Sequence, residues 1–329
     1  MSSIPFIQVG VGNRGATILQ DLLDRYQQQF RPVALVDIVP QFLDAAQSQH
    51  QLKSVPTYGN LGEALESHQE AEAVFIVTPA QYHTALIQES LDADKHVWTE
   101  KPLTYNFAEA RELANLAAAR DRSVVIGNQY QYNPLERQLQ HLVQSGRYGH
   151  PFLLTYIHHR HRPQMRAFTG DYPALWEQGV HSLDSILAIL GQPALKSVYA
   201  LGQRPPHSNY NHDTITNSLS EFEGGIQVYL LVTFDSQRTD WEIRVECTGA
   251  ALRLNPRQGP IEVIVDEQVI ETFGPLQSID PAIQDPYAAF HTAITTGRSV
   301  PTSIDINLNT IRWIDATVRS GQSALPVTL

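Results

Sequence analysis

The chain of 329 residues has little cysteine, no excess of basic charge and no long hydrophobic run. Cys247 is the only cysteine, which excludes an intrachain disulfide and suits a reducing compartment. With 34 acidic and 23 basic side chains the formal net charge is −11, so nucleic acid and anionic membranes are not expected as partners. No apolar stretch approaches the ~20 residues of a membrane helix, and no secretory signal pattern opens the chain. We therefore expect a cytoplasmic protein.

Short apolar runs alternate with helical patterns over residues 4–127. Strands are expected at 6–9, 32–37, 74–77, 96–99 and 123–126, with helices at 16–26, 41–50, 61–67, 83–93 and 107–120. Parallel strands need helical crossovers, so this alternation predicts an α/β Rossmann domain with a doubly wound parallel sheet at residues 1–127.

The pattern changes after Gly127. Strands are expected at 152–161, 198–201, 218–223, 227–234, 242–248 and 262–265, and helices at 134–145, 180–190, 287–296 and 308–320. Glu223-Gly224-Gly225 is typical of a hairpin turn. Residues 128–329 are therefore predicted to form a second, α+β domain built on an antiparallel sheet.

Gly10, Gly12 and Gly15 form a Gly-x-Gly-x-x-Gly pattern that follows a predicted strand and opens a predicted helix. The first glycine allows a tight turn, the second lets a pyrophosphate approach the backbone, and the third lets helix and strand pack closely. With Asn13 and Arg14 this loop is the candidate dinucleotide site, because helix N-termini favour anions. The other interpretation is a glycine-rich turn without a ligand.

Asp37 ends the second predicted strand. A carboxylate at this place accepts hydrogen bonds from the adenosine ribose hydroxyls and repels a 2′-phosphate, which favours NAD over NADP. A plain turn residue is the alternative. Thr78 and Pro79 end a later strand and would border the nicotinamide, while His83, which opens the next helix, is expected to be a packing or supporting residue rather than a proton carrier.

The turn Glu100-Lys101-Pro102 follows the strand-like run 96–99. Proline fixes its own φ and restricts the residue before it, so the Lys101 side chain is held in one direction. An ammonium held beside a bound dinucleotide can bind a substrate oxygen while hydride moves. Lys101 is therefore a candidate catalytic residue.

Glu177, His181 and Asp184 lie at the start of a predicted helix, four and three positions apart. These spacings place them on one helical face, and an acid beside a histidine in a polar cleft is the usual equipment for proton transfer. The alternative is a helix start with a buried, hydrogen-bonded histidine.

Taken together, these motifs resemble the Gfo/Idh/MocA family of oxidoreductases, which includes glucose-fructose oxidoreductase and inositol dehydrogenase. The resemblance covers nearly the whole chain, and it rests on the loop 10–15, on 78–83, on 100–102, on Gly179-Val180-His181 with Asp184, and on Gly127-Asn128-Gln129 with Asn133-Pro134. It implies a Rossmann domain and a substrate-binding domain with a large open antiparallel sheet, through which subunits often associate. A homodimer or homotetramer is thus expected.

The resemblance also implies site residues. Lys101 matches the lysine that contacts the substrate hydroxyl and the nicotinamide, and His181 matches the histidine that exchanges the proton; Glu100 and Gln129 fall among the expected cofactor-binding positions. The chain departs from the family at Glu177, where aspartate is usual, and at Gln131, near which many relatives carry arginine.

A basic stretch, His158 to Arg166, is unusual in so acidic a chain. Alternation puts His159 and His161 on one face, and Arg160 and Arg162 on the other. A solvated or subunit-interface edge, an anion-binding rim for a carboxylate or phosphate on the substrate, and a metal site are the competing interpretations.

The sequence thus predicts an NAD(P)-dependent dehydrogenase, with NAD favoured, acting on a secondary alcohol of a sugar, cyclic polyol or derivative, with no metal required. A reductase of a different substrate within the same class is one alternative. A non-catalytic dinucleotide sensor on the same fold is the other, although a sensor needs neither Lys101 nor His181.

Overall fold

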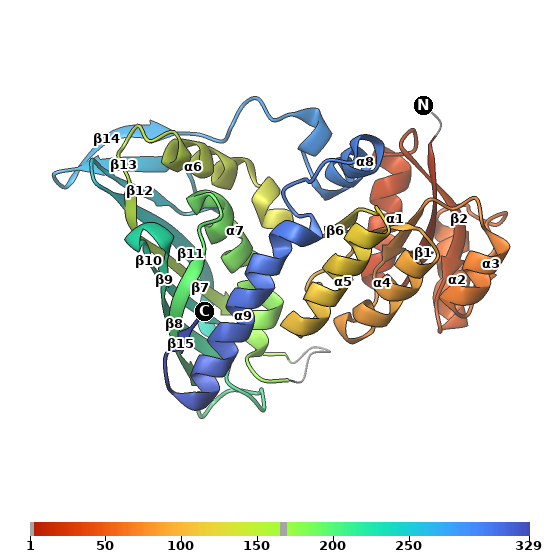
Figure 1. Ribbon diagram of the computed structural model, residues 1–329, viewed down its shortest axis with the longest axis horizontal. Helices are drawn as coiled ribbons and strands as arrows, with labels where there is room; N and C mark the ends of the chain where they lie inside the picture. Colours follow the sequence, from red (N-terminus) through yellow and green to blue (C-terminus); the bar gives the residue numbers. More distant parts are fainter. Residues whose placement is uncertain (1–2, 165–169) are drawn as a thin grey trace. The chain divides into compact units, whose positions relative to one another are not determined.

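The computed structural model describes residues 3–164 and 170–329. The chain divides into two compact units (Figure 1). The first consists of Met1–Gly127 with Pro281–Leu308, and the second of Asn128–Asp280 with Asn309–Leu329.

The first unit is built on a six-stranded parallel sheet. Its strands are β1 (Ile4–Val9), β2 (Phe30–Val36), β3 (Thr57–Tyr58), β4 (Ala73–Ile76), β5 (His96–Thr99) and β6 (Val124–Ile126), in the order β3-β2-β1-β4-β5-β6. The crossover helices are α1 (Asn13–Arg25), α2 (Pro40–Gln49), α3 (Leu61–Ser67), α4 (His83–Asp92) and α5 (Phe107–Ala119). The strand order reverses between β1 and β4, which is where dinucleotides bind in such sheets. The predicted Rossmann domain is confirmed.

One segment from near the end of the chain completes this unit. Helix α8 (Pro286–Thr296) places Phe290 against Phe30, with stacked rings whose centroids are 5.9 Å apart, and against the edge of Phe75 at 5.4 Å. The sequence analysis assigned every residue after 127 to the second domain, so the segment 281–308 departs from that division. A helical pattern shows which face is apolar but not which core that face joins.

The second unit is built on a nine-stranded sheet in the order β14-β13-β12-β11-β7-β10-β9-β8-β15. Its strands are β7 (Pro151–His161), β8 (Leu195–Gln203), β9 (Ile215–Phe222), β10 (Gln227–Thr233), β11 (Asp235–Cys247), β12 (Ala251–Leu254), β13 (Ile261–Val265), β14 (Gln268–Phe273) and β15 (Val327–Thr328). The neighbours β7 and β10 run parallel, so the sheet is mixed although mostly antiparallel. The expected hairpin at Glu223–Gly225 joins β9 to β10.

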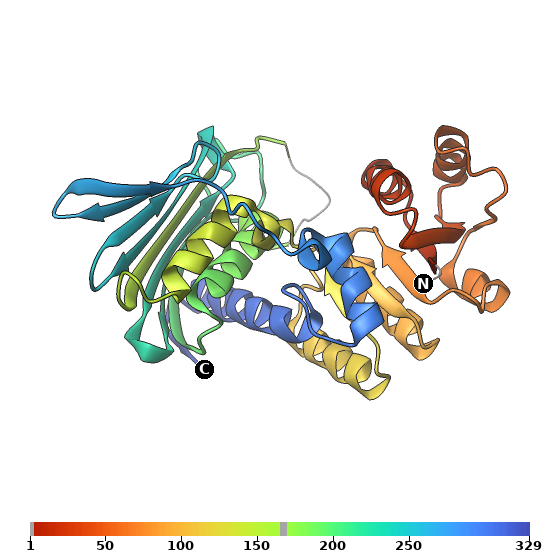
Figure 2. The same ribbon diagram turned by 90° about the horizontal axis from the view of Figure 1, so that it is seen from above.

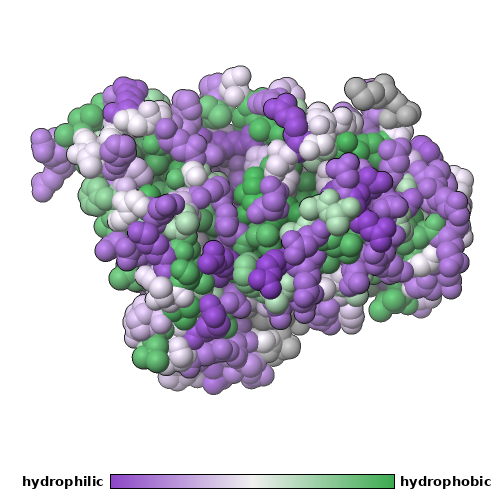
Figure 3. All heavy atoms as spheres, viewed as in Figure 1, coloured by the Kyte–Doolittle hydropathy of each residue, from purple (hydrophilic) through white to green (hydrophobic). Residues whose placement is uncertain are grey.

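Helices cover one face of this sheet. They are α6 (Pro134–Gln144), α7 (Val180–Leu190) and the later part of α9 (Ile304–Ser323), and Figure 2 shows them on the same side of the strands. Along β9, Ser218 and Ser220 are buried beneath the helices whereas Leu219 between them is 49% exposed. The opposite face of the sheet is therefore open. On the visible side in Figure 3, hydrophilic and hydrophobic residues are interspersed.

Within the described ranges, no helix is both long and apolar enough to cross a membrane.

Candidate active site

The glycine loop joins β1 to α1, and two of its glycines are required by the fold itself. Gly10 has φ +88°, and a Cβ on it would lie 2.4 Å from the carbonyl oxygen of Val77. A Cβ on Gly15 would lie 2.1 Å from the carbonyl oxygen of Gly10. The buried Gln8 amide fixes the loop by donating to the carbonyl oxygens of Gly10, at 3.1 Å, and Gly15, at 2.8 Å. No larger residue fits at either glycine without moving backbone.

Gly12 differs, because the fold does not require it. Its φ of −63° is ordinary for any residue, and a Cβ would meet only the Phe42 ring, at 3.4 Å. The helix that starts at Asn13 has no side-chain cap and no acidic residue in its first turn. The loop therefore leaves backbone N–H groups and space at a helix N-terminus, as a bound pyrophosphate requires. These residues fit a dinucleotide.

Asp37 is hydrogen-bonded to the backbone of the glycine loop. Its carboxylate accepts a hydrogen bond from the backbone N–H of Val11 and another from Val39, each at 2.9 Å. A carboxylate has about four acceptor sites, so two remain for ribose hydroxyls. Ile38, 82% exposed, and Phe42, 42% exposed, add an apolar surface beside the loop that the sequence analysis did not identify. An apolar residue directly after the strand-end acid is the signal that could have found Ile38.

His83 joins two loops at the carboxyl edge of the first sheet. Its ring nitrogens face the carbonyl oxygens of Pro102, at 2.8 Å, and Thr78, at 3.0 Å. Burial lowers the pKa of His83, against the effect of these two acceptors, and the fully buried side chain connects the two loops. That placement suits the supporting role expected for it. Pro79 directly follows Thr78 at the end of β4.

The turn after β5 is tied to the glycine loop. Arg14 donates from Nε to Glu100 at 2.7 Å, and the second carboxylate oxygen of Glu100 accepts from the backbone N–H of Lys101 at 3.1 Å. Partial burial lowers the pKa of Arg14, but the attraction of Glu100 outweighs this and raises the pKa overall. The Lys101–Pro102 peptide bond is cis. Lys101 is thus held at the same sheet edge as the candidate cofactor loop.

In the second unit, His181 lies in the first turn of α7, directly after one π-helical turn at Leu175–Gly179. It is 6% exposed. Its ring stacks on Tyr130, with centroids 4.6 Å apart and planes within 18°. Tyr130 belongs to the short 3-10 turn Gln129–Tyr132 that opens this unit, and the exposed Gln129, an expected cofactor-binding residue, is therefore part of the second unit. Tyr130 was not identified from the sequence.

Glu177 and Asp184, which flank His181 in the sequence, form contacts within the second unit. Glu177 accepts from Arg162 at 2.5 Å, and both side chains are largely buried. Asp184 accepts from Gln131 Nε2 at 2.7 Å and from Thr310 Oγ1 at 3.0 Å. Gln131 thus supplies a neutral donor to Asp184.

Side chains of the basic stretch form contacts within the second unit. Besides the pairing of Arg162, Arg160 donates to Gln178, and His161 Nδ1 contacts the carbonyl oxygen of Ser236 at 2.8 Å. His158 is fully buried, and burial lowers its pKa to about 3, so it is neutral. Arg166 lies outside the described residues. In those residues no group of three or more His, Cys, Asp or Glu could hold a metal ion.

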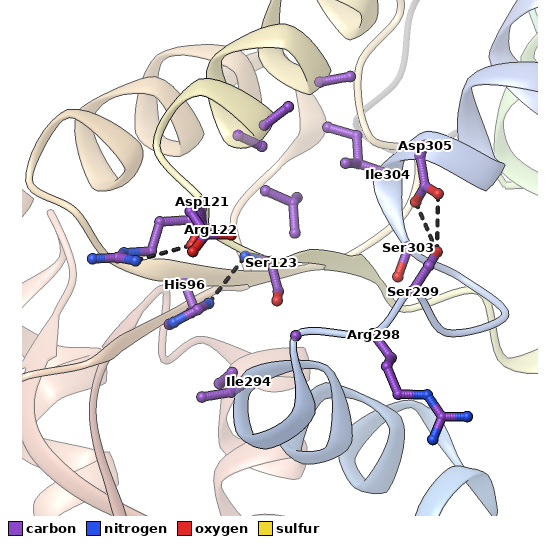
Figure 4. A pocket seen from close by; sticks show the side chains of 15 residues that line it. His96, Asp121, Arg122, Ser123, Ile294, Arg298, Ser299, Ser303, Ile304 and Asp305 are labelled. Atoms are coloured by element: carbon purple, nitrogen blue, oxygen red, sulfur yellow. Dashed lines mark hydrogen bonds between the residues drawn. The ribbon is translucent and has the colours of Figure 1, made fainter.

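A pocket of about 420 Å³ lies elsewhere in the first unit (Figure 4). His96 and Ser123, at the amino ends of β5 and β6, line it together with Arg298, Ser303 and Asp305. Cofactors bind such sheets at the carboxyl ends of the strands. This pocket is therefore not the dinucleotide site.

Two family descriptions match the chain. "Oxidoreductase family, NAD-binding Rossmann fold" matches residues 5–128, and "GFO/IDH/MocA C-terminal domain" matches residues 137–253. The inositol 2-dehydrogenase of Burkholderia ambifaria is 27% identical over 245 residues, which are 73% of this chain and 68% of that protein.

Solved structures show the same fold. An inositol dehydrogenase homolog from Azotobacter vinelandii, complexed with NADH and myo-inositol, has a TM-score of 0.84 at 20% identity, covering 100% of this chain and 98% of that one. The aldose-aldose oxidoreductase from Caulobacter crescentus, complexed with glycerol, has a TM-score of 0.84 at 19% identity, covering 99% and 100%.

The fold and the glycine loop define an oxidoreductase with an NAD-binding Rossmann domain. The chain belongs to the Gfo/Idh/MocA family, as the sequence motifs predicted.

Proposed function

We propose that the protein is an NAD-dependent dehydrogenase that oxidises a secondary alcohol of a cyclic polyol or sugar, or reduces the corresponding ketone. The observation that carries the proposal is the tie between Arg14 and Glu100, which holds Lys101 at the sheet edge of the glycine loop. The polyol specificity is supported by relatives named inositol 2-dehydrogenase, at 26–27% identity.

The roles follow from the chemistry of the side chains. When bound, NAD would be the hydride acceptor, and the loop 10–15 and Asp37 would hold it. Lys101 donates a hydrogen bond to the substrate oxygen and favours the negative charge that develops there. His181 takes the hydroxyl proton as the carbon gives up its hydride, which leaves a carbonyl and a protonated imidazole.

Glu177 and Asp184 act through their partners in this proposal. Asp184, bonded to Gln131 and Thr310, anchors the helix that carries His181. Glu177, in the π-helical turn directly before that helix, neutralises Arg162.

The test is NADH formation from NAD with a panel of cyclic polyols and aldoses, myo-inositol included. We expect turnover with at least one member that is lost in Lys101→Ala and in His181→Asn. NAD binding without turnover of any polyol or sugar would contradict the proposal and favour a dinucleotide sensor.

A further inference from the structure

An aromatic stack lies against the ring of His181, the candidate proton carrier. Tyr130 stacks on His181, and it also stacks on Trp241 of β11 with centroids 5.4 Å apart and planes within 15°. Trp241 is paired across the sheet with His158 of β7, and these two rings are 4.7 Å apart. The Tyr130 ring is therefore fixed by the rigid sheet as well as by His181.

A hydrogen bond fixes the Tyr130 ring within its own plane. Gln178 donates from Nε2 to the Tyr130 hydroxyl oxygen at 3.0 Å. The Gln178 carbonyl oxygen in turn accepts from Arg160, and Gln178 itself is buried. Stacking limits tilting of the ring and the hydrogen bond limits its sliding, so Tyr130 presents a defined flat surface to the imidazole.

A general base needs a group that orients it. A flat contact at 4.6 Å sets the plane of the His181 ring directly. The face of a phenol ring also attracts a cation, so the same contact favours the imidazolium that forms when the proton arrives.

We propose that Tyr130 is a positioning residue for His181, which holds the imidazole plane so that a ring nitrogen faces the substrate hydroxyl. The proposal rests on the proposed function of His181 as the group that exchanges the proton. Tyr130 itself does not accept or donate the transferred proton.

The first test compares Tyr130→Leu with Tyr130→Phe. Loss of the ring should lower kcat about ten- to a hundredfold, as small misplacements of catalytic groups do, while KM and the NAD dissociation constant change little. Tyr130→Phe keeps the stack and should restore most of kcat. Equal losses in both variants, or a loss confined to KM, would overturn the positioning role.

A double-mutant comparison checks that Tyr130 acts through His181. In a His181→Asn background, Tyr130→Leu should cause no further loss of the residual turnover, because the ring it positions is gone. The same fold loss in both backgrounds would show an independent effect and would overturn the proposal.

A third measurement needs no substrate. The stack places the ring protons of His181 in the ring current of Tyr130, so their NMR signal, assigned by its disappearance in His181→Asn, should move in Tyr130→Leu and stay nearly unchanged in Tyr130→Phe. A signal that does not move in Tyr130→Leu overturns the proposal whether or not any polyol is oxidised. A signal that moves, in a protein that oxidises no polyol or sugar, contradicts the proposed function alone.

Discussion

Arg14 and Glu100 lie 86 positions apart in the chain, yet they form an ion pair of 2.7 Å that joins the glycine loop to the lysine turn. Arg14 is about half exposed, so the pair contributes little to the free energy of unfolding. Its consequence is positional. The loop that would hold the pyrophosphate and the turn that carries Lys101 are fixed to each other within one rigid sheet edge.

Lys101→Ala should lower turnover by more than about tenfold and leave the NAD dissociation constant nearly unchanged, since a positioned contact to developing charge is typically worth at least that much. Lys95→Ala is the matched control. Lys95 directly precedes the same strand, at its opposite end, and donates to the carbonyl oxygen of Gln69. Steady-state kinetics of both variants decide the matter, and retention of most turnover in Lys101→Ala would refute the role.

Gly12→Ala and Gly15→Ala should separate binding from folding. Gly12 has an ordinary φ and open space, so alanine there should change the free energy of unfolding by less than about 1 kcal/mol and weaken NAD binding at least tenfold. Gly15→Ala forces a Cβ onto backbone and should cost about 1–3 kcal/mol of stability. Denaturant unfolding and NAD titration measure both. Unchanged NAD affinity in a folded Gly12→Ala would mean that the loop does not hold the cofactor.

NAD should bind more tightly than NADP, because the Asp37 carboxylate would face a 2′-phosphate. Asp37→Ser should shift the ratio of the two dissociation constants toward NADP. Asp37 also accepts from the N–H groups of Val11 and Val39, so the serine variant should be less stable. Asp37→Asn keeps an acceptor without the charge and is the control for that loop effect. Equal affinities in the wild type, measured at one salt concentration, would contradict the charge argument.

The sequence predicted the first unit well because each of its elements is local. Strand β1 is buried along its whole length, and all of its residues except Gln8 are apolar. The short strand Thr57–Tyr58 was missed because two residues form no pattern. The membership of 281–308 in the first unit was missed because the contact of Phe290 with Phe30 depends on the tertiary fold.

The candidate site shows the same limit. The spacing of Glu177 and His181 was visible in the sequence, whereas the partner of Glu177 was not, because Arg162 directly follows strand β7 and shares no local pattern with the turn that carries Glu177. The stack of Tyr130 on Trp241 joins a turn and a strand more than a hundred positions apart, and no local pattern signals it. Family motifs identify which residues carry chemistry, but long-range packing determines what surrounds them.

The open face of the second sheet should mediate self-association. Tyr199 and Leu219 are directly paired on neighbouring strands, and with Leu201 they expose apolar area on that face. We expect sedimentation at micromolar concentration to show a dimer or tetramer. The double variant Leu201→Glu with Leu219→Glu should dissociate it, whereas Leu325→Glu, at another exposed leucine, should not. A wild-type monomer of about 36.8 kDa would contradict this expectation.

Glu136 on α6 should make stability depend on pH. Burial raises its pKa from 4.5 to about 8, Ser185 partly opposes this by donating a hydrogen bond, and the charge of Asp184 adds to it. The folded state therefore holds a proton that the unfolded chain releases at lower pH. The stability that this proton provides is fully present below pH 4.5 and is lost as pH rises toward 8.

Glu136→Gln should remove this dependence, because glutamine stays neutral and can still accept from Ser185. We expect the variant and the wild type to be similar in stability at acid pH, and the variant to be more stable above pH 8 by up to a few kcal/mol, since each pKa unit corresponds to about 1.4 kcal/mol. Urea unfolding across this pH range measures the difference. Glu112→Gln, at an exposed position on α5, is the control and should follow the wild type. A Glu136→Gln variant whose stability falls as steeply as that of the wild type would show that another buried group takes up the proton.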